Sequence, residues 1–152
     1  MMNRRNALTQ SARVACLLVA AGVWPQLARA AFEAKAFEAK NMAELMAALG
    51  GSAPVQSADI TVTGPDIAEN GAVVPLGAST NLAGVKRMML LVEKNPSVLA
   101  AMFDVTPALE ANVSTRVKMG QSSDVYAVAM MSDGKVLFAK KEVKVTLGGC
   151  GG

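Results

Sequence analysis

Histidine is absent from this sequence of 152 residues, and cysteine occurs only twice, at Cys16 and Cys150. Without histidine the chain lacks the usual general base of a serine or cysteine hydrolase. It also lacks the commonest zinc ligand and a frequent axial ligand of haem. These absences argue against a self-sufficient hydrolase and against a resident zinc or His-ligated haem site, so we expect no metal or other cofactor in this chain.

The first thirty residues have the pattern of an export signal. Arg4 and Arg5 precede an apolar run over residues 14–24, and small residues lie just before position 31. That run is shorter than the roughly 20 apolar residues that a membrane-spanning helix needs. We therefore predict a signal peptide over residues 1–30, cleaved between Ala30 and Ala31, and a soluble mature protein in the periplasm.

The export route has two interpretations. The arginine pair favours the twin-arginine pathway, which carries folded proteins. Ala7 stands where that signal commonly has phenylalanine, so Sec export, with Arg4 and Arg5 as an ordinary basic n-region, is the alternative.

Removal of the signal changes the charge and the cysteine count. Four of the 15 basic residues lie in it, which leaves 11 against 12 acidic residues and a net charge of −1. Such a chain lacks the surplus positive charge typical of nucleic-acid binding. The remaining 122 residues suit one domain, predicted over residues 31–147. Cys150 is then the only cysteine, so an intramolecular disulfide is impossible.

Hydrophobic periodicity predicts one helix followed by strands. Residues 31–49 have helical character, with the helix at 37–49 and its end at Gly50-Gly51. Short β-type segments then alternate with turn residues, and Asp133-Gly134 marks a tight hairpin. The expected strands are 59–63, 72–76, 87–93, 98–104, 111–118, 125–131 and 136–147. About seven strands predict an all-β, immunoglobulin-like β-sandwich over residues 58–147.

The last five residues, Gly148-Gly149-Cys150-Gly151-Gly152, are predicted to form a flexible arm. Glycines have no side chains to pack and pay a large entropic cost on ordering. We expect the arm to leave directly from the edge of a sheet at Leu147, and an extended chain would let Cys150 sweep about 10 Å from there. Glycines on both sides would let the thiol enter a narrow channel.

Cys150 by itself is a mediocre nucleophile. A free thiol has a pKa of about 8.5, and the carboxylate of Gly152 disfavours ionisation further. Lys140, Lys141 and Lys144 would oppose this effect if the arm folded back. With no histidine to activate the thiol, we interpret the chain as a covalent carrier of sulfur compounds whose chemistry is done by partner enzymes, and not as an enzyme.

Four alternatives remain for the arm. It could be a tail without function, although exposed free cysteines are generally avoided. The cysteine could join two chains of an exported binding module through an intermolecular disulfide. The terminal Gly-Gly could belong to a ubiquitin-like sulfur carrier, against which the export signal and the adjacent thiol argue. Autonomous thiol catalysis is the fourth alternative, and the missing base argues against it.

The C-terminal sequence Val143-Lys144-Val145-Thr146-Leu147-Gly148-Gly149-Cys150-Gly151-Gly152 resembles the SoxY family, the sulfur carriers of the bacterial thiosulfate-oxidising (Sox) system. The resemblance extends over nearly all of the mature chain. Its other segments are Ile67-Ala68-Glu69-Asn70-Gly71-Ala72-Val73-Val74-Pro75, Glu93-Lys94-Asn95-Pro96, Val113-Ser114-Thr115-Arg116 and Asp133-Gly134-Lys135.

This resemblance implies a heterodimer with SoxZ and transient contacts with three enzymes. SoxXA, a c-type cytochrome, would couple thiosulfate oxidatively to Cys150. SoxB, a manganese-containing hydrolase, would release sulfate, and SoxCD, a molybdenum and haem enzyme, would oxidise the remaining sulfane sulfur. Haem, manganese and molybdenum would thus belong to the partners.

Overall fold

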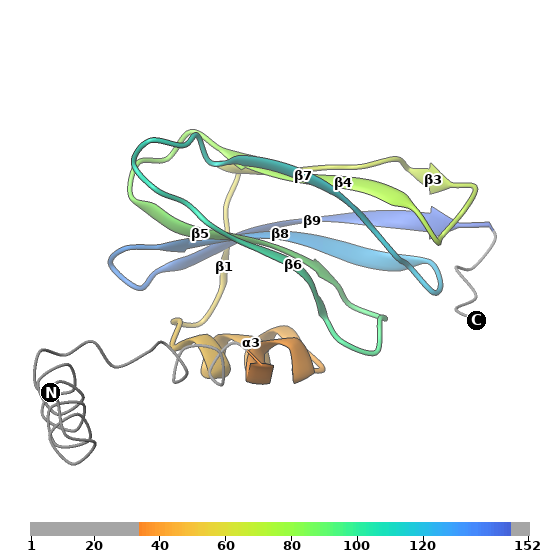
Figure 1. Ribbon diagram of the computed structural model, residues 1–152, viewed down its shortest axis with the longest axis horizontal. Helices are drawn as coiled ribbons and strands as arrows, with labels where there is room; N and C mark the ends of the chain where they lie inside the picture. Colours follow the sequence, from red (N-terminus) through yellow and green to blue (C-terminus); the bar gives the residue numbers. More distant parts are fainter. Residues whose placement is uncertain (1–33, 147–152) are drawn as a thin grey trace, which may run out of the picture. The chain divides into compact units, whose positions relative to one another are not determined.

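Nine β-strands form two facing sheets in residues 34–146, the part of the chain that the computed structural model describes (Figure 1). The predicted signal peptide, its cleavage site and the glycine arm lie outside these residues. A short helix at residues 34–38 precedes helix α3 at Met42–Leu49. The strands are β1 (Val55–Gln56), β2 (Ile60–Thr63), β3 (Ile67–Ala68), β4 (Val74–Thr80), β5 (Val85–Val92), β6 (Leu99–Asp104), β7 (Asn112–Val117), β8 (Ser123–Met131) and β9 (Val136–Val145).

The larger sheet has the strand order β1-β9-β8-β5-β6, and β3 also pairs with β9. The smaller sheet has the order β2-β4-β7. All neighbours are antiparallel except β1 and β3, which run parallel to β9. This arrangement is an immunoglobulin-like β-sandwich with an N-terminal helix, which confirms the predicted fold class.

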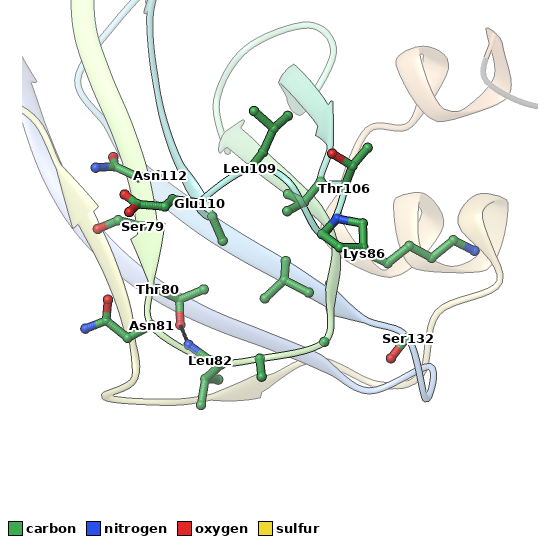
Figure 2. A pocket seen from close by; sticks show the side chains of 16 residues that line it. Ser79, Thr80, Asn81, Leu82, Lys86, Thr106, Leu109, Glu110, Asn112 and Ser132 are labelled. Atoms are coloured by element: carbon green, nitrogen blue, oxygen red, sulfur yellow. Dashed lines mark hydrogen bonds between the residues drawn. The ribbon is translucent and has the colours of Figure 1, made fainter.

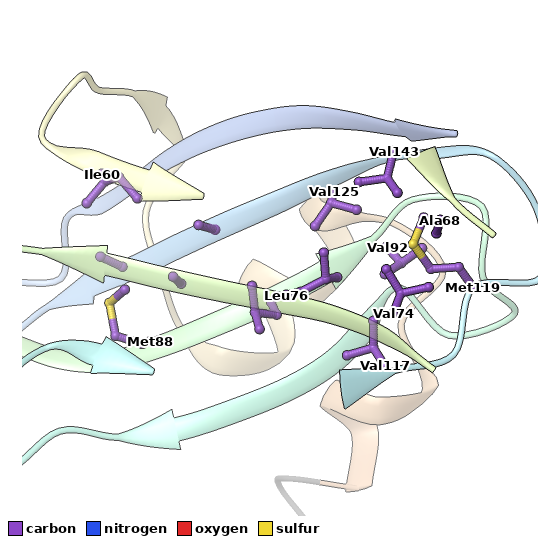
Figure 3. Close-up of a cluster of buried hydrophobic side chains, with 14 of the residues drawn as sticks. Ile60, Ala68, Val74, Leu76, Met88, Val92, Val117, Met119, Val125 and Val143 are labelled. Atoms are coloured by element: carbon purple, nitrogen blue, oxygen red, sulfur yellow. The ribbon is translucent and has the colours of Figure 1, made fainter. Parts of the chain in front are cut away.

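Apolar side chains from both sheets fill the space between them (Figure 3). Alternate residues of each strand point inward, as the two-residue period of a β-strand requires. The fully buried members include Val74 of β4, Met88, Leu90 and Val92 of β5, Val125 of β8 and Val143 of β9. This core joins the two sheets and fixes the position of β9, the strand that precedes the glycine arm.

Helix α3 covers the opposite face of the larger sheet (Figure 1). Its buried residues Leu45 and Met46 belong to one cluster with Met89, Leu91 and Val128 of the sheet. Strand β5 is therefore buried on both faces, and this explains why its sequence has five consecutive apolar residues at 88–92 instead of an alternating pattern.

The predicted helix at 37–49 is interrupted in the structure. Residues 39–41 are not helical, because the Asn41 side chain accepts a hydrogen bond from the Glu44 amide at 2.9 Å and caps a new helix. A Glu44 carboxylate oxygen accepts one from the Lys40 amide at 2.8 Å. Gly50 ends α3 with a φ of 69°, which confirms the predicted end.

Strand β4 differs from its predicted range of 72–76. The Asn70 side chain accepts a hydrogen bond from the Ala72 amide at 2.9 Å, so this segment turns and the strand begins only at Val74. The strand then continues past Gly77, where an added side-chain carbon would collide with the Thr63 hydroxyl. The hairpin at Asp133-Gly134 is confirmed, with a φ of 87° at Gly134.

Two strands of the structure were not predicted. The sandwich begins at β1, before the predicted start at residue 58, and β3 lies in a stretch predicted to be a loop. Each has only two residues, which is too short to show an alternating pattern. Because β3 pairs with Lys144 and Val145, β9 is not an edge strand where it ends, contrary to the expectation that the arm leaves directly from the edge of a sheet.

Tyr126, the sole tyrosine of the chain, gives a pH-dependent prediction. Burial, followed by the charge of Glu93 and its hydrogen bond with the hydroxyl at 3.2 Å, raises the pKa of Tyr126 to about 12. Because the folded state holds this proton more tightly, the free energy of unfolding should fall as the pH rises from about 10 to about 12. We expect Glu93→Gln to lower the pKa while burial keeps it above 10. The absorbance of the phenolate measures the pKa of Tyr126. Identical titration curves for the wild type and Glu93→Gln would contradict the contribution of Glu93 to this pKa.

Candidate functional site

The root of the predicted arm is the described part of the candidate site. Cys150 and the four glycines of the arm lie outside the described residues, as does Leu147. The structure places the end of β9 and Thr146 in full, and these residues decide from which point the arm starts. Val143, close to the end of β9, has a fully buried side chain and anchors the root in the core between the sheets.

Strand β3 holds one side of this root. The Lys144 amide donates to the Asp66 carbonyl at 2.9 Å, and the Thr146 amide donates to the Ala68 carbonyl at 3.1 Å. The Thr146 hydroxyl donates to the Glu69 carbonyl at 3.1 Å. These three bonds continue the sheet up to the last described residue of the chain.

Ser122 holds the other side. Regular pairing between β8 and β9 ends at Ser123 and Val143. Beyond that point the Val145 amide donates to the Ser122 hydroxyl oxygen at 2.8 Å, and this hydroxyl lies 3.5 Å from the Val145 carbonyl. The serine side chain thus replaces a backbone partner that β8 no longer supplies. The root is fixed on both sides, and Cys150 lies four residues beyond Thr146, within about 14 Å for an extended chain.

Two of the three lysines near the root are engaged in ion pairs. Lys140 pairs with Asp124 at 3.1 Å. Lys141 pairs with Asp66 at 2.9 Å and also donates to the Gly64 carbonyl at 2.6 Å. The hydrogen bond from Lys141, and then its charge, lower the pKa of Asp66, so this carboxylate is ionised at neutral pH. Among the described residues no ion pair involves Lys144, which is the exposed cation closest in sequence to the arm.

A cavity of about 870 Å³ lies at the opposite end of the sandwich (Figure 2). Its lining comes from the end of β4, the loop to β5 and the start of β5, from the loop between β6 and β7 with the first residue of β7, and from Ser132 of the β8–β9 hairpin. Strand β9 has ten residues, so about 30 Å separate the hairpin from the root. Because the arm reaches only about 14 Å, the Cys150 of this chain cannot enter this cavity.

The described chain offers no metal centre. Within residues 34–146, no group of three or more His, Cys, Asp or Glu side chains is arranged to hold a metal ion. In the same range no helix is long and apolar enough to cross a membrane.

Sequence reasoning missed Ser122 and the residues of β3 as parts of the site. Serine in a loop carries no specific signal, and a two-residue strand carries no period. A hint was available, because the segment at 67–75 was among those that resemble known sulfur carriers. The structural role of this segment, which is the pairing of Ile67 and Ala68 with the end of β9, is visible only in the structure.

The hydrogen bond from Val145 to Ser122 can be tested by amide exchange. We expect Ser122→Ala to speed exchange of the Val145 amide about fivefold, because one net hydrogen bond is worth about 1 kcal/mol. The Lys144 amide, which is bonded to β3, serves as the internal control and should keep its rate. Unchanged exchange at Val145, measured by NMR, would contradict the role of Ser122.

Comparisons with known proteins agree with this geometry. The family model described as sulfur oxidation protein SoxY matches residues 45–150. The structure of the sulfur carrier protein SoxY from Chlorobium limicola f thiosulfatophilum is 34% identical, with a TM-score of 0.60, and the match covers 68% of this chain and 93% of that one. No curated protein sequence gave a significant match.

A second group of solved structures shares the fold alone. Superoxide reductase (neelaredoxin) from Ignicoccus hospitalis is 20% identical with a TM-score of 0.50, and the match covers 57% of this chain and 79% of that one. At this identity the likeness extends to the sandwich and not to the activity.

Proposed function

Because the chain belongs to the SoxY family of sulfur oxidation proteins and resembles a sulfur carrier of that family, we propose that it binds thiosulfate-derived sulfur covalently on Cys150. It would present this sulfur to partner enzymes in the periplasm during oxidation to sulfate. The chain itself would be a substrate platform and not an enzyme.

One observation carries the proposal: a firmly held strand end stands directly before a glycine-rich segment with the only cysteine of the predicted mature chain. The root is bonded on both sides up to Thr146, while the segment 148–152 has four glycines and one cysteine. A fixed origin and a length of about 14 Å restrict the thiol to a small volume, which suits delivery to one docked active site after another.

The proposed loading step is an oxidation. The Cys150 thiolate and thiosulfate would form an S–S bond, giving Cys–S–S–SO₃⁻ and releasing two electrons to the c-type cytochrome partner, SoxXA. Hydrolysis by SoxB would then add one water, release sulfate and two protons, and leave the persulfide Cys–S–S⁻. SoxCD would then accept six electrons as the outer sulfur takes three oxygen atoms from water, giving Cys–S–SO₃⁻ and six protons.

The proposed partners supply every redox and metal group that these steps need. SoxZ would form the heterodimer that presents the arm, while haem, manganese and molybdenum would reside in the enzymes. The supporting observation is the sequence itself, which has no histidine and, after signal removal, a single cysteine. Export with the signal at residues 1–30, by the twin-arginine or the Sec route, would place the carrier in the periplasm.

Intact-mass analysis of the protein from thiosulfate-grown cells tests the proposal. We expect sulfur adducts that a thiol reductant removes, and we expect none on Cys150→Ala, since only Cys150 can form the S–S bond. Adducts that persist on Cys150→Ala would overturn it. Continued thiosulfate oxidation by cells that carry Cys150→Ser would instead favour a binding module whose cysteine serves dimerisation.

A further inference from the structure

A second cavity, of about 410 Å³, lies on the smaller sheet where β2 separates from β4. It is lined by Thr63, Gly64, Pro65, Pro75, Leu76, Ser114, Thr115 and Arg116. Strand alternation places Ser114 and Arg116 on the outer face of the sheet, since the neighbouring Val117 is buried in the core. The cavity is therefore open to solvent and lies on the outside of the sandwich.

The lining has one charged side chain, the guanidinium of Arg116. It carries no carboxylate, and two hydroxyl groups on the same outer face, from Thr63 and Ser114, accompany the arginine. Among the described residues Arg116 has no ion pair. Asp66, which follows the lining residue Pro65, is engaged by Lys141 at 2.9 Å. An unpaired guanidinium beside hydroxyl groups suits an oxyanion, because its planar fork binds two oxygens at once.

This cavity lies near the root of the arm, unlike the larger one. The Thr146 amide is bonded to the Ala68 carbonyl at 3.1 Å, and Ala68 is three residues from Pro65, which lines the cavity. Three residues span at most about 11 Å, whereas the arm places Cys150 up to about 14 Å from Thr146. A group carried on the Cys150 sulfur extends further still.

We propose that this cavity, here called the Arg116 pocket, docks the sulfonate end of the thiosulfate adduct carried on Cys150 of the same chain. The occupant is the terminal segment 147–152 in its loaded form, and the inference rests on the proposed function. The adduct ends in a negatively charged sulfonate, which the positively charged guanidinium of Arg116 complements. Docking would shield the S–S bond from stray thiols between encounters with enzymes. The empty arm and the persulfide lack the sulfonate and would not be retained in this way.

The experiment uses the full mature chain loaded chemically with tetrathionate. The Cys150 thiolate attacks a central sulfur of S₄O₆²⁻, which gives Cys–S–S–SO₃⁻ and leaves S₂O₃²⁻. We measure the rate at which dithiothreitol releases the adduct at low salt. Arg116→Gln is expected to speed release about threefold, the size expected for an exposed charged pair. High salt should remove the difference, because it screens such pairs.

Lys118→Gln is the matched control, since it removes one positive charge from an exposed position just after the end of β7, two residues from Arg116 and outside the pocket. It should release the adduct at the wild-type rate. Equal release from wild type and Arg116→Gln would overturn the docking proposal, as would equal acceleration by both variants. Circular dichroism and thermal unfolding should show that both exposed variants fold as the wild type does. Chemical loading does not depend on the cellular role, so absence of adducts in cells would contradict the carrier function without deciding this measurement.

Discussion

Deletion of Gly148 and Gly149 is expected to slow sulfate release from the loaded carrier by its partner enzymes at least tenfold. The deletion shortens the reach of Cys150 from Thr146 from about 14 Å to about 7 Å. Because the root is bonded on both sides, the strand end cannot follow the thiol to restore the lost length. A misplacement of about 1 Å in a reacting group can cost about a hundredfold, so a loss of about 7 Å of reach should be severe.

Two controls separate reach from reactivity. The reaction of Cys150 with a small reagent such as iodoacetamide should keep its rate, since a small molecule diffuses to the thiol. The double variant Gly148→Ala with Gly149→Ala keeps the length of the arm and should retain more activity than the deletion. Sulfate release at the wild-type rate after deletion would contradict a carrier that works by reach.

Leu90→Ala is expected to lower the free energy of unfolding by about 3 kcal/mol, the usual loss for a leucine removed from a tight core. Leu90 is fully buried in the middle of β5, where it pairs with Ala101 of β6 and Ala127 of β8. These alanines are too short to fill the resulting cavity. For a domain of about this size the melting temperature should fall by about 10 to 20 °C.

Leu109→Ala provides the control for the same chemical change. Leu109 is 62% exposed, so its truncation should alter the free energy of unfolding by less than about 0.5 kcal/mol. Urea unfolding of both variants measures the difference. Similar losses in the two proteins would mean that the core around Leu90 is not packed as described.

Much of the fold was readable from local patterns. The strand at 112–117 alternates Val113, Thr115 and Val117 with exposed residues, and the structure has it within one residue of its predicted ends. The helix end at Gly50 and the turn at Gly134 were found because both positions need a positive φ. The helix start was misplaced, because the capping bond between Asn41 and Glu44 competes with a continuous helix.

For the candidate site, the sequence and the structure each revealed a different part. The lone thiol, the missing histidine and the length of the glycine arm are properties of the covalent chain, and the sequence alone determined them together with the resemblance to SoxY. The hydrogen bonds that fix the root of the arm involve residues distant in sequence. The Glu69 carbonyl, for example, accepts a hydrogen bond from the Thr146 hydroxyl, 77 positions away. The Arg116 pocket likewise depends on residues distant in sequence, because its lining comes from positions 63–65, 75–76 and 114–116.

The sequence by itself therefore determined that a histidine-free, all-β chain carries a single thiol on its glycine-rich C-terminal segment after signal removal. Only the tertiary structure decided that the arm starts from a strand end bonded on both sides, near a pocket lined by Arg116 and out of reach of the larger cavity. The physical reason is that strand pairing and cavities arise from contacts between distant segments, and a two-residue strand or a single serine leaves no periodic trace in the sequence.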